Sequence, residues 1–179
     1  MWEGLVNLAK EIAQSGAVWL PILSRVVGVA FVLGAGLLQI QVVRAGPVDA
    51  MPKGWVPLFM AMCGFLMLGF GNVLRALSET VGGSGGEQAL ALTAYTTPDL
   101  SGLAGMDPLA GVVFLVTAFI WFFRFVGACF VFQGIAHWKA TVQGLRRYPG
   151  FFVVTKLVSG TLTMNADVVA KALQATLGS

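Results

Sequence analysis

Long uncharged stretches are the feature that most limits what this sequence can fold into. Arg25 is the only charged residue between residues 17 and 43, and no charge occurs from residue 54 to residue 74. A third stretch, residues 109–138, is interrupted only by Arg124. At 1.5 Å per residue, each stretch is long enough to cross about 30 Å of hydrocarbon as a helix. The sequence therefore predicts membrane-spanning helices.

The composition excludes several classes of protein. Hydrophobic residues make up 57% of the chain and charged residues 11%, against about 25% charged residues in an ordinary soluble domain. So few charges cannot cover the apolar surface of a soluble enzyme, and the scattered basic residues form no direct nucleic-acid motif. Cys63, Cys129 and His137 have no disulfide or metal-ligand spacing, which predicts packing roles. We expect no catalytic residue, no metal site and no enzyme activity.

An internal repeat organises the chain. Residues 25–32 align with residues 124–131 at an offset of 99, with matching Arg, Val, Gly, Phe and Val. A second block aligns at an offset of 96: Gly64 falls on Gly160, and residues 73–77 fall on residues 169–173. Chance similarity between apolar sequences is the alternative, but the matched basic residues and glycines favour two copies of one unit: a long helix, a basic turn and a second helix.

These observations predict an all-α membrane protein of four long helices, arranged as two tandem, parallel-repeated helical hairpins. The expected helices cover about 12–43, 54–77, 108–141 and 150–176. The expected segments are an interfacial N-terminal helix at 1–16, a first hairpin at 17–77, a Gly-rich polar connector at 78–108 and a second hairpin at 109–179. The glycine run in the connector predicts a flexible link, because no Lys-Ser or Lys-Thr pair follows it as in a phosphate loop.

The charges on the two turns predict the topology. The first turn carries Arg44 and Lys53, and the second carries Lys139, Arg146 and Arg147, whereas the connector and its edges are acidic. The positive-inside rule then places both turns in the cytoplasm and both termini in the periplasm. The acidic start of the chain predicts that no signal peptide is cleaved. The five basic residues are also candidates for binding phospholipid headgroups, the one cofactor-like ligand that we expect.

Arg25 and Arg124 lie inside apolar helices, where a charge is costly. Three interpretations stay open: snorkelling to the membrane surface, an ion pair or lipid-phosphate contact between subunits, and a proton or ion pathway. If Arg124 forms an ion pair or polar contact, Asp167 and Asn165 are its candidate partners. Small residues along the helix faces, such as Gly28 with Ala35 and Gly127 with Gly134, allow close packing within one bundle or between subunits.

The layout resembles the small membrane proteins of type IVB secretion systems and I-type conjugative plasmids (the IcmC, DotE and DotV group and the TraQ-like proteins). The pattern Gly64, Gly69 and Gly71 within residues 55–77 carries this resemblance, together with the ending at residues 164–178. The repeated unit also resembles the conjugative pilin hairpin, in which two apolar helices flank a short basic turn. That resemblance implies a turn facing a filament lumen and bound phospholipid. This chain differs in having two units, and we expect it to lack the long cleaved leader of the pilins.

The leading hypothesis is a structural subunit of a conjugation or type IV secretion apparatus, either an inner-membrane component or a pilus subunit. Its expected partners are copies of itself, as a homo-oligomer or filament, other subunits of the machine and phospholipid. Its expected location is the bacterial inner membrane, or a pilus extracted from that membrane. The alternatives are a small membrane channel or transporter with a parallel internal repeat, and a membrane-bound assembly factor.

Overall fold

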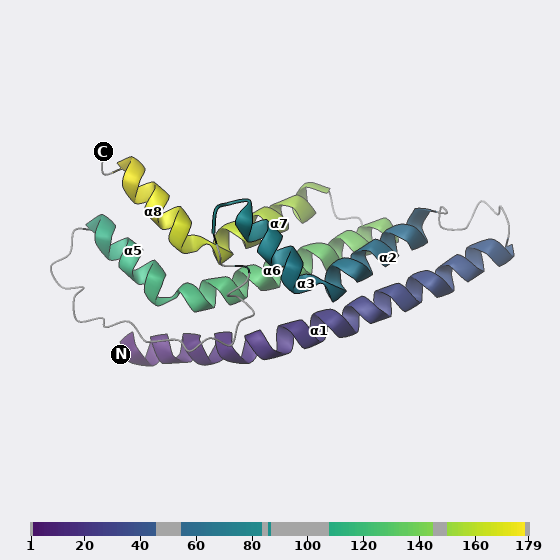
Figure 1. Cartoon of the computed structure of the whole chain (residues 1–179), viewed down its shortest axis with the longest axis horizontal. Helices are drawn as coiled ribbons and strands as arrows, with labels where there is room; N and C mark the ends of the chain where they lie inside the picture. The colour runs from purple at the N-terminus through teal and green to yellow at the C-terminus, as the bar shows by residue number, and fades with distance from the viewer. Residues whose placement is uncertain (1, 46–54, 84–85, 87–107, 145–149, 178–179) are drawn as a thin grey trace.

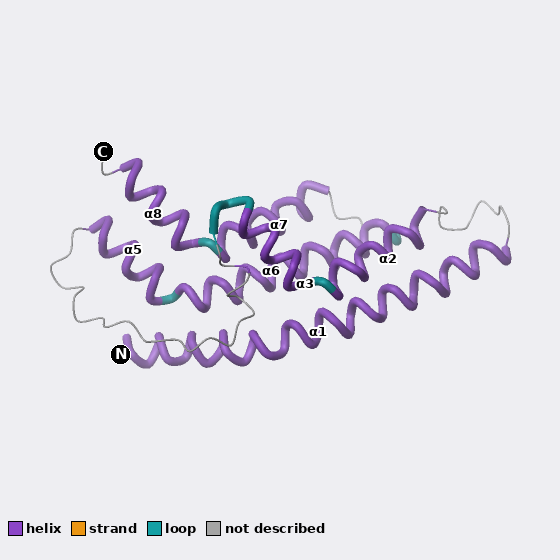
Figure 2. The backbone as a smooth tube through the Cα atoms, viewed as in Figure 1, coloured by secondary structure: helices purple, strands orange, loops and turns teal. Residues whose placement is uncertain are grey.

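The computed structural model describes residues 2–45, 55–83, 86, 108–144 and 150–177, and in these residues the regular structure is entirely helical (Figures 1 and 2). The all-α prediction is therefore confirmed. The helices are α1 (Trp2–Ala45), α2 (Trp55–Leu68), α3 (Phe70–Glu79), α5 (Pro108–Ala118), α6 (Ile120–Val142), α7 (Gly150–Met164) and α8 (Ala166–Leu177).

Apart from the start of α1, the helices begin and end close to the expected limits, but three of the four expected helices are broken. Gly69 separates α2 from α3, Phe119 separates α5 from α6, and Asn165 separates α7 from α8. The break at Gly69 bends the α2–α3 pair by 81°. Gly69 has φ −91° and ψ 26°, and Phe119 has φ −100° and ψ 12°, so both lie outside the helical region. Run length and hydropathy do not detect such one-residue interruptions.

The N-terminal residues differ from the expectation of a separate interfacial helix. Residues 2–16 are the first part of α1, which continues without a break to Ala45. Pro21 is inside this helix, and the Ser24 hydroxyl donates a hydrogen bond to the Pro21 carbonyl at 2.9 Å. At 1.5 Å per residue, α1 is about 66 Å long, roughly twice the thickness of the hydrocarbon layer. Part of α1 therefore extends beyond any single bilayer that it crosses.

Two of the described helices are long and apolar enough to cross a membrane: α1, over Asn7–Arg44, and α6. The bent pair α2–α3 would be a third span if it is counted as one helix, and α7 is apolar but shorter. The expected connector lies almost entirely outside the described residues.

Glycines bring α1 into backbone contact with α2, and α6 into backbone contact with α7. A Cβ added at Gly28 on α1 would lie 2.9 Å from the Gly64 carbonyl oxygen on α2. At Gly127 on α6 it would lie 2.6 Å from the Gly160 carbonyl oxygen on α7. These pairs occupy equivalent positions in the sequence repeat. Only a residue without a side chain permits this close approach of two helices.

The apolar core lies where α2 and α3 pack against α6 and α7. Met67, Phe70 and Leu74 from α2 and α3 are fully buried there with Val131 and Met164 from α6 and α7. The outward faces are different, because large apolar side chains of α1, α2 and α7 are exposed along their length. Examples, which are 62% to 81% exposed, are Trp19, Val26, Leu33, Leu58 and Phe151.

Candidate functional site

A buried ion pair lies next to the helix breaks of the second half of the chain. Arg124, on the second turn of α6, is 8% exposed, and its Nη2 atom is 3.8 Å from Oδ2 of Asp167. Asp167 is in the first turn of α8, where the helix dipole favours a negative charge. The guanidinium carbon also lies 5.5 Å from the centre of the Trp121 ring, and the buried Nε of Arg124 has no hydrogen-bond partner among the described residues. This pair joins α6 to α8.

Asn165 forms a second polar contact at the same break. Its Oδ1 accepts a hydrogen bond from the Ser78 hydroxyl at 2.6 Å, and its Nδ2 donates to the Thr161 carbonyl at 2.9 Å. Asn165 and Ser78 are 0% and 1% exposed. Because a buried polar group needs a partner, this contact fixes the end of α3 against the α7–α8 break.

The chain leaves α3 through a glycine turn that fits against Asn165. Gly82 has φ +74°, its N–H donates to the Glu79 carbonyl, and the Gly83 N–H donates to the Ser78 carbonyl. This is the Schellman pattern that ends many helices. A Cβ added at Gly83 would clash with Oδ1 of Asn165. The first two glycines of the expected flexible connector are therefore a helix cap that packs on the polar contact.

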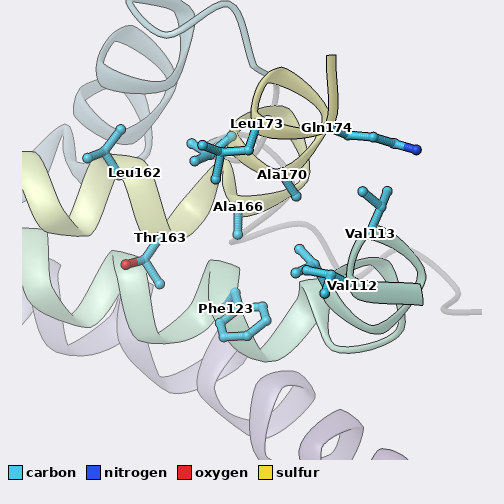
Figure 3. Close-up of a pocket in the computed structure, with 11 residues that line it drawn as sticks. Val112, Val113, Phe123, Leu162, Thr163, Ala166, Ala170, Leu173 and Gln174 are labelled. Atoms are coloured by element: carbon cyan, nitrogen blue, oxygen red, sulfur yellow. The ribbon is translucent and has the colours of Figure 1, made fainter. Parts of the chain in front are cut away.

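An apolar groove opens between α5 and α8, beside the ion pair (Figure 3). Its volume is about 470 Å³. The lining includes Val112 and Val113 from α5, Phe123 from α6, and Ala166 and Ala170 from α8. Thr163 also lines the groove, but its hydroxyl donates to the Ser159 carbonyl at 2.7 Å. With that hydroxyl already bonded, the groove suits an apolar occupant.

Two of the expected basic residues, Arg44 and Lys139, lie in the last turns of α1 and α6. In Figure 1, α1 and α6 end at the same end of the molecule, where α2 and α7 begin. Arg44 is exposed, and Nζ of the half-buried Lys139 lies 4.4 Å from the centre of the Phe31 ring. Phe59 lies between Trp55 and Trp138, with ring centres 6.1 Å and 4.8 Å apart. Aromatic and basic side chains together are typical of a membrane interface.

The structure does not bring all of the predicted site residues together. Arg25 is exposed, so it does not share the buried environment of Arg124. Of the two candidate partners of Arg124, Asp167 pairs with it, whereas the hydrogen bonds of Asn165 described above join it to Ser78 and Thr161. Lys53, Arg146 and Arg147 lie outside the described residues.

Two further polar residues were not expected from the sequence. Ser78 lies at the edge of the apolar run, where nothing local distinguishes it from an exposed serine. Lys156, on α7, donates a hydrogen bond to Oε1 of Gln133, and its Nζ lies 5.6 Å and 5.4 Å from the ring centres of Phe130 and Phe152. The sequence did contain a signal for this contact: Lys156 is a cation within an apolar helix and lies one turn from an aromatic residue.

Comparison of the chain with protein-family models, with curated proteins and with solved structures finds no match. Among the described residues, no three His, Cys, Asp or Glu side chains lie close enough together to hold a metal ion.

Proposed function

We propose that this chain is a structural subunit of a membrane-embedded conjugation or type IV secretion apparatus, and that it assembles with copies of itself and with phospholipid. The observation that carries the proposal is the exposed apolar face of α1, α2 and α7. Leu33, Leu37 and Leu58 are 64%, 64% and 74% exposed. Apolar surface of this extent has to be covered by lipid or by other protein subunits.

The proposed architecture is two tandem helical hairpins pointing the same way. The matched contacts support it, because Gly28 meets Gly64 just as Gly127 meets Gly160. The flanking contacts also correspond: an added Cβ at Gly28 would meet Leu68, and one at Gly127 would meet Met164 at the equivalent position. Two units with the same backbone packing are a natural building block for a ring or filament.

Phospholipid is the proposed counter-charge at the basic end. Arg44 and Lys139 end the first helix of each hairpin, and the aromatic contacts of Trp55 and Trp138 lie at the same level. Basic residues near a membrane surface attract anionic headgroups by about 1 kcal/mol each. In the proposed topology this end faces the bacterial cytoplasm and both termini face the periplasm. In a pilus the same end would face the lumen.

The test is the composition of the protein purified from its own membranes. We expect homo-oligomers that retain phospholipid, measured by light scattering and by mass spectrometry of extracted lipid. Deletion of the gene in its host should abolish conjugative transfer or secretion, with recovery when the gene is restored. A lipid-free monomer that restores transfer would contradict the proposal.

A channel or transporter is the second candidate, favoured by the broken helices and the buried Arg124–Asp167 pair. Transporters commonly place functional charges where membrane helices are interrupted. Ion or proton flux in proteoliposomes separates the two functions. Flux that is lost in the Asp167→Asn variant would favour the channel, whereas no flux from a well-inserted oligomer would favour the structural subunit.

A further inference from the structure

Within one chain, α6 docks on the first half of the molecule through one helix face. The contacts on α1 are Phe125 at Gly16 and Lys139 over the Phe31 ring. The remaining contacts are Trp138 with Phe59 at 4.8 Å between ring centres, Phe132 with Phe70 at 5.9 Å, and Gln143 Nε2 with the Met60 sulfur at 2.8 Å. Four α6 residues and the C-cap residue thus define the docking face: Phe125, Phe132, Trp138, Lys139 and Gln143.

The same face exists on α1. At the repeat offset of 99, the equivalent α1 residues are Val26, Leu33, Gln39, Ile40 and Arg44. All five are exposed, with Val26 at 62%, Leu33 at 64% and Ile40 at 49%. The residues of α1 that correspond to the docking face of α6 are therefore ones that the described part of the chain leaves uncovered.

The receiving surface is also repeated, and in the second unit it is hollow. Met67, Phe70 and Leu74 are fully buried beneath the docked α6. At the offset of 96 their equivalents are Thr163, Ala166 and Ala170, which all line the groove between α5 and α8 (Figure 3). Each equivalent side chain is smaller. The groove therefore occupies the position that, in the first unit, belongs to the interface between the units.

We propose that the second unit of one copy receives α1 of a second copy in the way that the first unit receives α6, so that copies add head to tail. This inference rests on the proposed function as a self-assembling subunit. It specifies which residues meet: Leu33 faces Ala166, Ile40 faces Phe130, and Gln39 faces Thr155. Gln39 and Thr155 are exposed polar residues on apolar helices, and such residues form hydrogen bonds between helices in membranes.

Head-to-tail addition joins two different surfaces, so it produces a closed ring or an open filament instead of a two-fold dimer. The equivalence also brings Arg44 of one copy to Lys156 of the next, in place of the contact between Gln143 and Met60. Two cations there require a counter-charge, which the proposed phospholipid supplies. In the proposed assembly, a phospholipid headgroup therefore lies at the contact between two copies, next to Arg44 and Lys156.

Disulfide trapping tests the register. The full chain carries Cys129→Ala, while Cys63 is kept because it is fully buried. The variant Gln39→Cys with Thr155→Cys is oxidised in native membranes and analysed on non-reducing gels. We expect a ladder of trimers and higher species, at least tenfold stronger than in the control Gln41→Cys with Thr155→Cys. Gln41 is also exposed on α1, but two residues along the helix turn its side chain about 160° away from that of Gln39.

Single-cysteine variants distinguish head-to-tail assembly from a two-fold symmetric dimer. Gln39→Cys alone should give no dimer, and a mixture of Gln39→Cys with Thr155→Cys should give dimers only. A strong homodimer of Gln39→Cys would overturn the proposal, because it would place α1 against α1 about a two-fold axis. The pair Ile40→Cys with Phe130→Cys gives an independent reading of the same register.

Light scattering on the reduced protein separates this inference from the proposed function. If the protein is oligomeric but neither cysteine pair (Gln39→Cys with Thr155→Cys, or Ile40→Cys with Phe130→Cys) gives a disulfide ladder, head-to-tail docking is overturned. The proposal of a self-assembling subunit would still hold. A reduced protein that is monomeric under all membrane-like conditions would overturn both.

Discussion

The two halves of the molecule share their backbone packing and differ in the polarity of their interiors. Gly28 with Gly64, and Gly127 with Gly160, set the same close approach of two helices in each half. Beyond that contact, the second half carries Asn165 and Asp167 where the first half has Gly69 and Gly71 at the repeat offset of 96. The comparison teaches that glycines define the shared hairpin, whereas the polar residues at the second break distinguish one unit from the other.

The largest expected loss of stability comes from adding a side chain at the glycine contacts that the two halves share. Gly28→Ala and Gly127→Ala each place a Cβ within 3.0 Å of a backbone oxygen on the facing helix. Because backbone cannot move aside without separating the helices, we expect each variant to lose about 3 kcal/mol of stability. Thermal unfolding of the detergent-solubilised protein, followed by circular dichroism, measures the loss.

The control for this pair is Gly36→Ala, since an added Cβ at Gly36 meets no atom within 4 Å. It should be neutral or stabilising by up to about 1 kcal/mol, because alanine has the higher helix propensity. If Gly28→Ala and Gly127→Ala differ by more than about 1 kcal/mol, the two hairpins are not equivalent in packing.

The next largest effect is a difference in stability between variants of the two repeated arginines, Arg124 and Arg25. Arg124→Gln leaves the Asp167 carboxylate without its cation, and Asp167 is only 26% exposed. We expect a loss of about 2 kcal/mol, below the 3–5 kcal/mol typical of fully buried pairs because of that exposure. Arg25→Gln should change the unfolding free energy by less than about 0.5 kcal/mol, since Arg25 is exposed.

The double variant Arg124→Leu with Asp167→Leu tests whether the lost stability comes from the unpaired charge. Replacing a buried ion pair by apolar side chains is often neutral, so we expect most of the stability to return. Equal losses in Arg25→Gln and Arg124→Gln would contradict the difference in their environments.

The sequence left open whether Arg124 forms an ion pair or snorkels, and it named Asp167 only as one of two candidate partners. It was sufficient for the helical class and for the outer limits of the expected helices, except for the start of the first helix. Apolar runs and the repeat carry those signals over many residues. The breaks at Gly69, Phe119 and Asn165 were not predicted, because one non-helical residue does not alter hydropathy averaged over a span. The partner of Asn165 was also missed, since Ser78 is 87 residues away and only the fold brings the two together.

Exchanging the residues at the two breaks gives a smaller effect. Asn165→Gly makes the second break like the first and removes the hydrogen bonds to Ser78 and Thr161. Because the Ser78 hydroxyl is then buried without Asn165, we expect a loss of about 1 to 2 kcal/mol. The reciprocal variant Gly69→Asn should change stability little, since the nearest atom to an added Cβ is at 3.5 Å. Comparable losses in both would show that the Ser78 contact does not stabilise the second break.

The smallest effects concern the basic residues that end the first helix of each hairpin. Arg44 is exposed, whereas the Lys139 ammonium lies 4.4 Å from the centre of the Phe31 ring. Arg44 therefore has more of its charge available to a headgroup, and Arg44→Gln should weaken binding of anionic phospholipid by about 1 kcal/mol, roughly fivefold. Lys139→Gln should weaken it by less, because the Phe31 ring already stabilises part of that charge.

Mass spectrometry of retained lipid at matched detergent concentrations measures both effects. The control is Arg75→Gln, because Arg75 is an exposed residue of α3. If Arg75→Gln reduces retained lipid as much as Arg44→Gln does, the binding follows net charge and not the basic end of the hairpins.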